Sequence, residues 1–128
     1  MEDRASIETR AMGVYYRRQD GGEFTVRNGD ALEARRDPEN PYDENAISLH
    51  VQDGERIGWV ARYLSEGLAP LMDAGRLLSV RVRLVEDTSV WITLVGGAVD
   101  DHQELARLAQ IAAQARHDAE PYTENPFL

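Results

Sequence analysis

Short stretches of alternating apolar and polar residues, separated by turn signals, constrain this chain more than any other feature. Residues 46–51 read Ala-Ile-Ser-Leu-His-Val, which places Ile47 and Leu49 on one face of an extended strand. Asp53-Gly54 follows and is typical of a tight hairpin turn, so residues 56–60 are predicted to form the neighbouring strand. The residue pattern alone therefore predicts an antiparallel pair at the centre of the chain.

The same pattern predicts further strands on both sides of this pair. Clusters of Gly, Asn and Asp separate them, as expected for turns. The additional strands are expected at residues 7–16, 24–27, 31–35, 77–85 and 90–95. Short strands at such close spacing are typical of an all-β barrel.

Two segments change to the periodicity of a helix. Leucines recur at helical spacing within residues 62–74, where Pro70 predicts a short or broken helix. Asp101 is placed to cap a second helix over about residues 101–118, which carries an apolar stripe. The predicted fold is mainly β: a small antiparallel β-barrel of OB or SH3-like type, with one inserted short helix and one C-terminal helix. The alternative is an open antiparallel sheet with helices on one face.

Composition excludes several classes of site. The 128 residues suggest one domain without cysteine, and the three histidines are far apart, so we expect no disulfide and no metal site. No P-loop, nucleophile elbow or other catalytic motif is present, so we expect neither an enzyme nor a cofactor. No signal peptide or membrane-spanning run is visible, and a cytoplasmic protein without a membrane partner is expected.

The net charge of −9 is unevenly distributed along the chain. Residues 13–85 carry ten arginines and twelve acidic residues, whereas residues 86–128 carry two arginines and eight acidic residues. The chain has no lysine, which is the pattern of a GC-rich genome but also suits bidentate contacts with phosphate. We expect the acidic C-terminal part, residues 100–128, to be an addition that does not bind nucleic acid.

The densest polar stretch is RRDPENPYDENAI, residues 35–47. Two prolines stiffen it, and Asn and Asp side chains bond nearby backbone amides, so its shape is expected to be set locally. Such rigidity favours a loop that binds something. The alternative is a structural loop in which Asp43 and Asn45 cap turns while Tyr42 packs on the barrel.

Four blocks in this order resemble the HIRAN domain family and cover about residues 7–86. They are Gly13-Val14-Tyr15-Tyr16, then residues 36–47 around Asn40-Pro41-Tyr42-Asp43, then Ile57-Gly58-Trp59-Val60-Ala61-Arg62, and finally residues 68–75. The resemblance implies a small OB-like barrel in residues 7–86, to which residues 87–99 add a strand, residues 100–118 a helix and residues 119–128 a tail. In one eukaryotic fork-remodelling helicase, the HIRAN domain captures the 3′ end of single-stranded DNA, and the resemblance implies the same partner here.

The resemblance also implies roles for individual residues. Tyr42 would stack on a base, Asp43 would accept the 3′-hydroxyl, and Asn40 would shape the pocket. A further set is expected to contact the same strand: Tyr15, Tyr16, Arg36, Trp59 and Arg62. Val14 and Trp59 replace a basic residue and a histidine of the eukaryotic pocket, and this lowers the charge available for phosphate.

The implied partner is therefore a single-stranded DNA 3′ end, within DNA repair or replication-fork processing, together with a helicase or other repair protein. The alternative is a protein-interaction module in which the terminal helix or the tail occupies or replaces the DNA groove. Asp73, outside the implied pocket, is expected to serve the end of its helix or a turn.

Overall fold

The computed structural model describes residues 5–14, 26–52, 54–87 and 89–119. Within these residues the strands form one six-stranded sheet in the order β1-β6-β5-β2-β3-β4, and every neighbouring pair is antiparallel. The elements are β1 (Ile7–Arg10), β2 (Ala31–Arg36), β3 (Ile47–His50), β4 (Arg56–Trp59), α2 (Arg62–Asp73), β5 (Ser79–Glu86), β6 (Ser89–Val95), α3 (Gly97–Asp100) and α4 (His102–Ala119).

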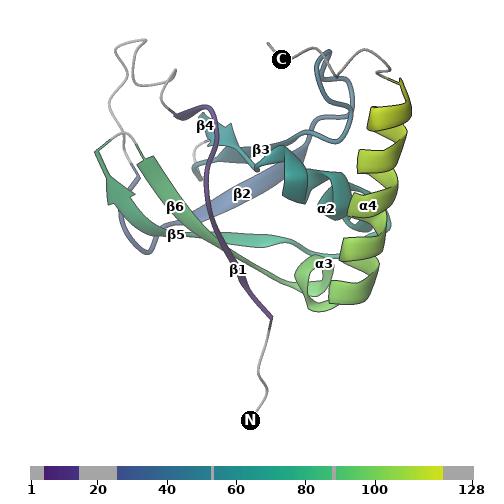
Figure 1. Ribbon diagram of the computed structural model, residues 1–128. Helices are drawn as coiled ribbons and strands as arrows, with labels where there is room; N and C mark the ends of the chain where they lie inside the picture. The colour runs from purple at the N-terminus through teal and green to yellow at the C-terminus, as the bar shows by residue number, and fades with distance from the viewer. Residues whose placement is uncertain (1–4, 15–25, 53, 88, 120–128) are drawn as a thin grey trace.

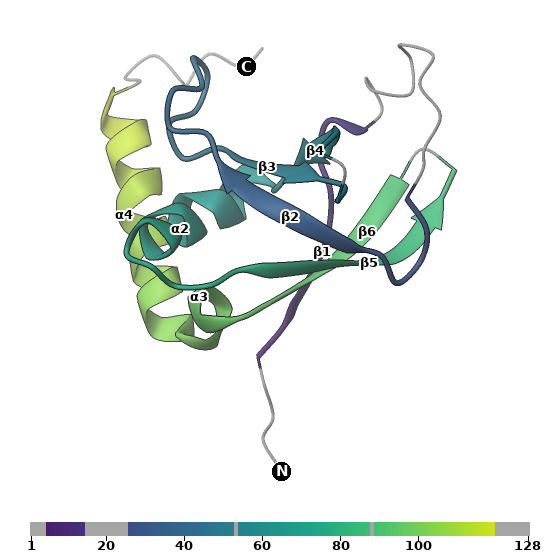
Figure 2. The ribbon, with the colours of Figure 1, turned by 180° about the vertical axis from the view of Figure 1, so that it is seen from behind.

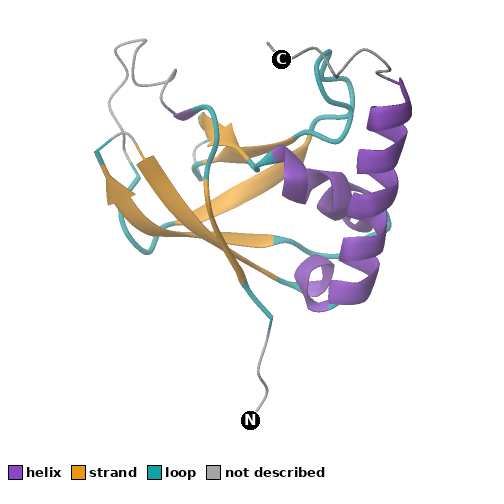
Figure 3. Cartoon of the chain, viewed as in Figure 1, coloured by secondary structure: helices purple, strands orange, loops and turns teal. Residues whose placement is uncertain are grey.

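The sheet curls into a half-barrel, and its two edges meet at one point (Figures 1 and 2). Met12, just after β1, forms an isolated bridge to Trp59 at the end of β4, and each donates its N–H to the other's carbonyl oxygen at 2.8 Å. The helices gather on one side of the sheet (Figure 3). The mainly β, barrel-like class predicted from the alternating pattern is confirmed.

The core lies between the sheet and α2. Val80 pairs with Leu94, and Val82 with Ile92, so the inward residues of β5 and β6 form one apolar surface while Arg81 between them faces out. All four inward side chains are buried, and each contributes ~1.5–3 kcal/mol relative to an exposed position.

Two predicted strands differ from the structure. The strand expected over residues 7–16 ends at Arg10, and Gly13 turns the chain with a φ of +78°, which a continuing strand does not adopt. In the strand expected at 24–27, Val26 and Arg27 are not in a strand, because the Arg27 N–H donates to the Asp30 carboxylate at 2.9 Å within a turn. The other positions, 15, 16, 24 and 25, lie outside the described residues.

Helix α2 is not broken at Pro70, contrary to one of the two expected forms. Pro70 stands near its C-terminal end, so only one helical hydrogen bond is lost, and the buried side chains of Leu68 and Leu71 hold the segment against the core. The helix ends in a Schellman motif: Gly75, with a φ of +93°, donates to the Met72 carbonyl oxygen, and the next residue donates to that of Leu71, both at 2.9 Å.

Helix α4 packs on α2 through a close backbone contact (Figure 1). A Cβ at Gly67 would lie 2.6 Å from the Leu105 carbonyl oxygen, so only glycine permits this approach. Asp101 caps α4 as predicted, because its Oδ1 accepts the N–H of Glu104 at 3.2 Å. Further along, Ile111 is exposed, so the apolar stripe is buried only near its start. Among the described residues, no helix is both long and apolar enough to cross a membrane.

Candidate nucleic-acid interface

Loop 37–45 connects β2 to β3 and is ordered by its own side chains. Asn40 Oδ1 accepts the backbone N–H groups of Tyr42 (2.9 Å) and Asp43 (3.1 Å), and its Nδ2 donates to Asp37 Oδ2 at 3.2 Å. Asp43 Oδ1 accepts the Asn45 N–H at 2.9 Å. The loop therefore has a locally fixed shape that does not depend on an apolar core.

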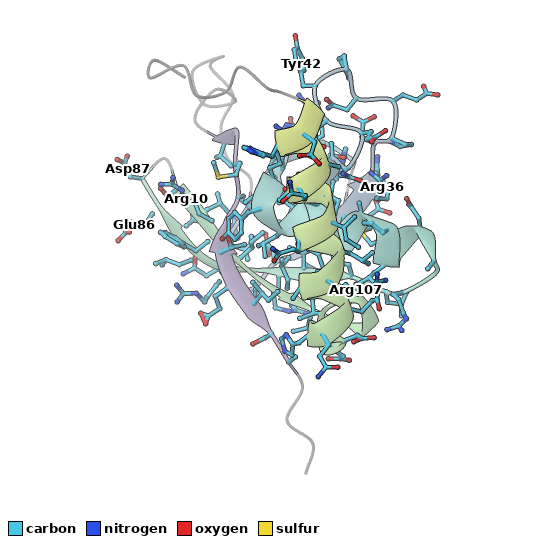
Figure 4. All side chains as sticks on the ribbon, turned by 45° about the vertical axis from the view of Figure 1, so that its right-hand side comes forward. Arg10, Arg36, Tyr42, Glu86, Asp87 and Arg107 are labelled. Atoms are coloured by element: carbon cyan, nitrogen blue, oxygen red, sulfur yellow. The ribbon has the colours of Figure 1, made fainter. Side chains whose placement is uncertain are left out.

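Tyr42 projects from the tip of this loop (Figure 4). It is 89% exposed, so the alternative in which Tyr42 packs on the barrel is wrong. Its backbone N–H is nevertheless held by Asn40. An aromatic ring that is exposed on a fixed backbone presents a flat apolar surface to a partner at little further cost in backbone ordering.

Asp43 and Arg62, which are distant in sequence, come together beside the loop. Asp43 Oδ2 lies 3.8 Å from Arg62 Nε, with the Asp43 side chain 19% exposed and that of Arg62 52% exposed. The carboxylate is thus partly enclosed, while the guanidinium at the start of α2 remains accessible. Together they present an acceptor and a cation side by side, which suits a hydroxyl next to a phosphate.

The other predicted site residues occupy different environments. Trp59 is half-buried at the seam of the sheet, with the Arg56 guanidinium 4.8 Å from its ring centroid and Gly13 packed against its edge. Arg36 is held by Asp73 and by carbonyl oxygens of the loop's closing end. Tyr15 and Tyr16 lie outside the described residues. The structure thus brings together Asn40, Tyr42, Asp43 and Arg62.

The sequence profile of the HIRAN domain matches residues 5–95, which include every strand of the sheet. The chain belongs to the HIRAN domain family. The helicase-like transcription factor of Homo sapiens is 40% identical to it over 48 residues, which are 38% of this chain and 5% of that protein. This HIRAN chain therefore corresponds to only a small part of the curated relatives it matches.

Solved HIRAN structures share the fold. The crystal structure of the HIRAN domain of human HLTF has a TM-score of 0.67 at 21% identity, over 84% of this chain and 88% of that one. The NMR structure of the same domain in its DNA-bound conformation has a TM-score of 0.63 at 21% identity, over 85% and 88%. At this level of identity the likeness concerns the fold of the HIRAN barrel.

The sequence did not reveal the role of Asp73 at the base of loop 37–45. It was expected to serve a helix end or a turn, but it pairs with Arg36, which ends β2. Its position indicated only that Asp73 has some cationic partner, because a carboxylate in the last turn of a helix is unfavourable beside the helix dipole. Within the described residues, no cluster of His, Asp or Glu is arranged to hold a metal ion.

A groove of about 670 Å³ lies away from the loop, where β2 diverges from β5 after pairing only at Ala31 and Leu32. None of its lining residues belongs to loop 37–45. Asn40, Tyr42, Asp43 and Arg62 are therefore not part of this groove. The outward-facing part of its lining combines the apolar Val95 with five polar residues, Glu33, Ser79, Arg81, Arg83 and Thr93.

Proposed function

We propose that this chain is a non-catalytic nucleic-acid-binding module that takes the 3′ end of single-stranded DNA. One observation carries the proposal: Tyr42 is 89% exposed on a loop whose backbone is fixed by Asn40. Membership of the HIRAN family supports it, and the HIRAN domain of HLTF has been solved in a DNA-bound conformation. The process served would be DNA repair or replication-fork processing in the cytoplasm, beside a helicase or other repair protein.

Each side chain has a role that its chemistry permits. Tyr42 stacks on a base near the end, and Asp43 accepts the terminal hydroxyl, which a carboxylate does readily. Arg62 neutralises a backbone phosphate near that end. Trp59, Tyr15 and Tyr16 complete the aromatic surface, with the last two assigned by family resemblance.

A titration with a short single-stranded oligonucleotide tests the proposal. Tyr42→Ala should weaken binding by about 1–3 kcal/mol, the value of one stacked base, whereas Tyr42→Phe should retain most of it. Asp43→Asn should reduce the preference for a free 3′-hydroxyl over a 3′-phosphate, because it removes repulsion between two anions. Glu44→Gln, at the adjacent exposed carboxylate, is the matched control.

Salt should weaken binding only shallowly, since few arginines surround the loop and the chain has a net charge of −9. Absence of binding at low salt, or binding that ignores both substitutions in folded protein, would rule the proposal out.

The second candidate is a protein-interaction module, which the groove between β2 and β5 favours. Under this alternative the groove receives a partner chain, and loop 37–45 is a structural connection. Substituting Val95, which lines the groove, with Glu would then abolish partner binding, while Tyr42→Ala would leave it intact.

A further inference from the structure

Arg36, the last residue of β2, lies beside loop 37–45 and the end of α2 (Figure 4). Its Nε donates to Asp73 Oδ1 at 3.0 Å and its Nη2 donates to Asp73 Oδ2 at 3.3 Å, which makes a bidentate pair. Nη1 donates to the carbonyl oxygen of Ala46 at 2.7 Å, and Nη2 also donates to that of Glu44 at 3.0 Å. These contacts use four of the five N–H donors of a guanidinium, and the side chain is only 16% exposed.

The contacts join three parts of the molecule. Arg36 opens loop 37–45, Glu44 and Ala46 close it, and Asp73 ends α2. The Ala46 carbonyl oxygen also accepts the Asp37 N–H at 3.0 Å, so this one oxygen connects the two ends of the loop. The guanidinium therefore fastens the base of the loop to the end of the helix.

The charges at the ends of α2 point to the same conclusion. The helix has no acidic residue in its first turn and no basic residue in its last; instead it begins at Arg62 and ends at Asp73. Both charges have the wrong sign for the helix dipole. Both have partners across from the helix, Arg62 with Asp43 and Asp73 with Arg36. These end charges thus serve the loop and not the helix.

We propose that Arg36 is a positioning residue: with Asp73 it forms a clasp that holds loop 37–45 on α2, and it does not touch the bound strand. The consequence for binding rests on the proposed function. The clasp replaces the direct DNA contact that the sequence predicted for Arg36. It keeps the backbone of Tyr42 and Asp43 in place before a strand arrives, which lowers the ordering cost of binding.

Amide hydrogen exchange tests the clasp without any ligand. Arg36→Lys removes the planar fork but keeps the charge, and Asp73→Ala removes the acceptor while relieving the unfavourable dipole contact. Both variants should exchange about tenfold faster at the amides of Asp37, Asp43 and Asn45, with β5 and β6 unchanged. Arg35→Lys, at a neighbouring exposed ion pair with Glu33, is the control and should leave the loop unchanged. Unaltered loop exchange in both variants overturns the clasp.

Binding of a short single strand with a free 3′-hydroxyl, measured over a range of salt, tests the positioning role. The clasp predicts that Arg36→Lys and Asp73→Ala both weaken binding about tenfold without a change in the salt slope. A phosphate contact predicts the opposite: Arg36→Lys binds normally, Asp73→Ala binds more tightly, and Arg36→Gln lowers the slope by about one. That second pattern refutes the positioning role. If the unmodified protein binds no strand, the proposed function fails, while the exchange comparison still decides the clasp.

Discussion

Loop 37–45 and the contact between α2 and α4 are both well ordered, but for opposite reasons. The loop is fixed by hydrogen bonds from Asn40 and Asp43 to backbone amides, and its tip, Tyr42, is exposed. The helix contact is fixed by shape, since Gly67 lies directly against the Leu105 backbone. Because the loop is held by hydrogen bonds to its own backbone, the side chain of Tyr42 remains available to a partner. The close contact between the helices leaves no comparable side chain exposed. Damage to the loop should therefore change binding, and damage to the helix contact should change stability.

The largest expected effect is at Gly67. Gly67→Val should lower the free energy of unfolding by about 3 kcal/mol, because the added carbons meet backbone and side-chain atoms of Leu105. Urea unfolding measures this change. Ala106→Val adds a similar volume at an exposed position of α4 and should change stability by less than about 1 kcal/mol. Equal effects from the two variants would show that the helices do not need the close approach.

Asn40→Ala tests the loop, because it should reduce binding without lowering stability. The backbone N–H groups of Tyr42 and Asp43 lose their acceptor, so single-stranded DNA should bind about tenfold more weakly, which is about 1.4 kcal/mol. Thermal unfolding should change little, because no apolar surface is uncovered. Glu39→Ala, at an exposed position of the same loop, serves as the control. A large loss of stability without a loss of binding would contradict the distinction drawn between the two regions.

Asp101→Ala tests the helices, because it should lower stability without changing binding. Removing the cap of α4 should lower the free energy of unfolding by about 1 kcal/mol, because the Glu104 N–H loses its acceptor. Binding of a single strand should be unchanged, which a parallel titration checks. Asp101→Asn retains a capping oxygen and should restore most of the stability.

Deletion of residues 119–128 should have the smallest effect. The free energy of unfolding should stay within about 0.5 kcal/mol, and DNA binding should be unchanged or slightly tighter because the deleted segment is acidic. Loss of binding in a deletion variant that still folds would place the segment in the site.

The sequence predicted the parts of the fold that are encoded locally. The alternation around Ile47 and Leu49 predicted the hairpin of β3 and β4, and Asp101 predicted the start of α4. It did not show whether Pro70 breaks α2, because burial of the neighbouring leucines decides that outcome. The residues of a short segment determine its propensity for a helix or a strand, but they do not show which distant residues it packs against.

The candidate site was predictable to a similar degree. The Asn and Asp residues of loop 37–45 indicated a self-ordered segment, and the bonds made by Asn40 agree with that. The partner of Arg36 was not predictable, because Asp73 belongs to a helix far along the chain and no spacing rule connects them. For the same reason the meeting of Asp43 with Arg62 appears only once α2 is placed beside the loop.

The position of β1 in the sheet has a consequence for how this protein is made. Ile7 pairs with Leu94 and Arg10 with Trp91, so the first strand to leave the ribosome has its ladder partner in the last strand of the sheet. The hairpin of β3 and β4 can close long before that. Contacts of such long sequence separation slow folding and leave an unpaired edge on the nascent chain. The sheet of this chain is therefore completed only when β6 has been synthesised and pairs with β1.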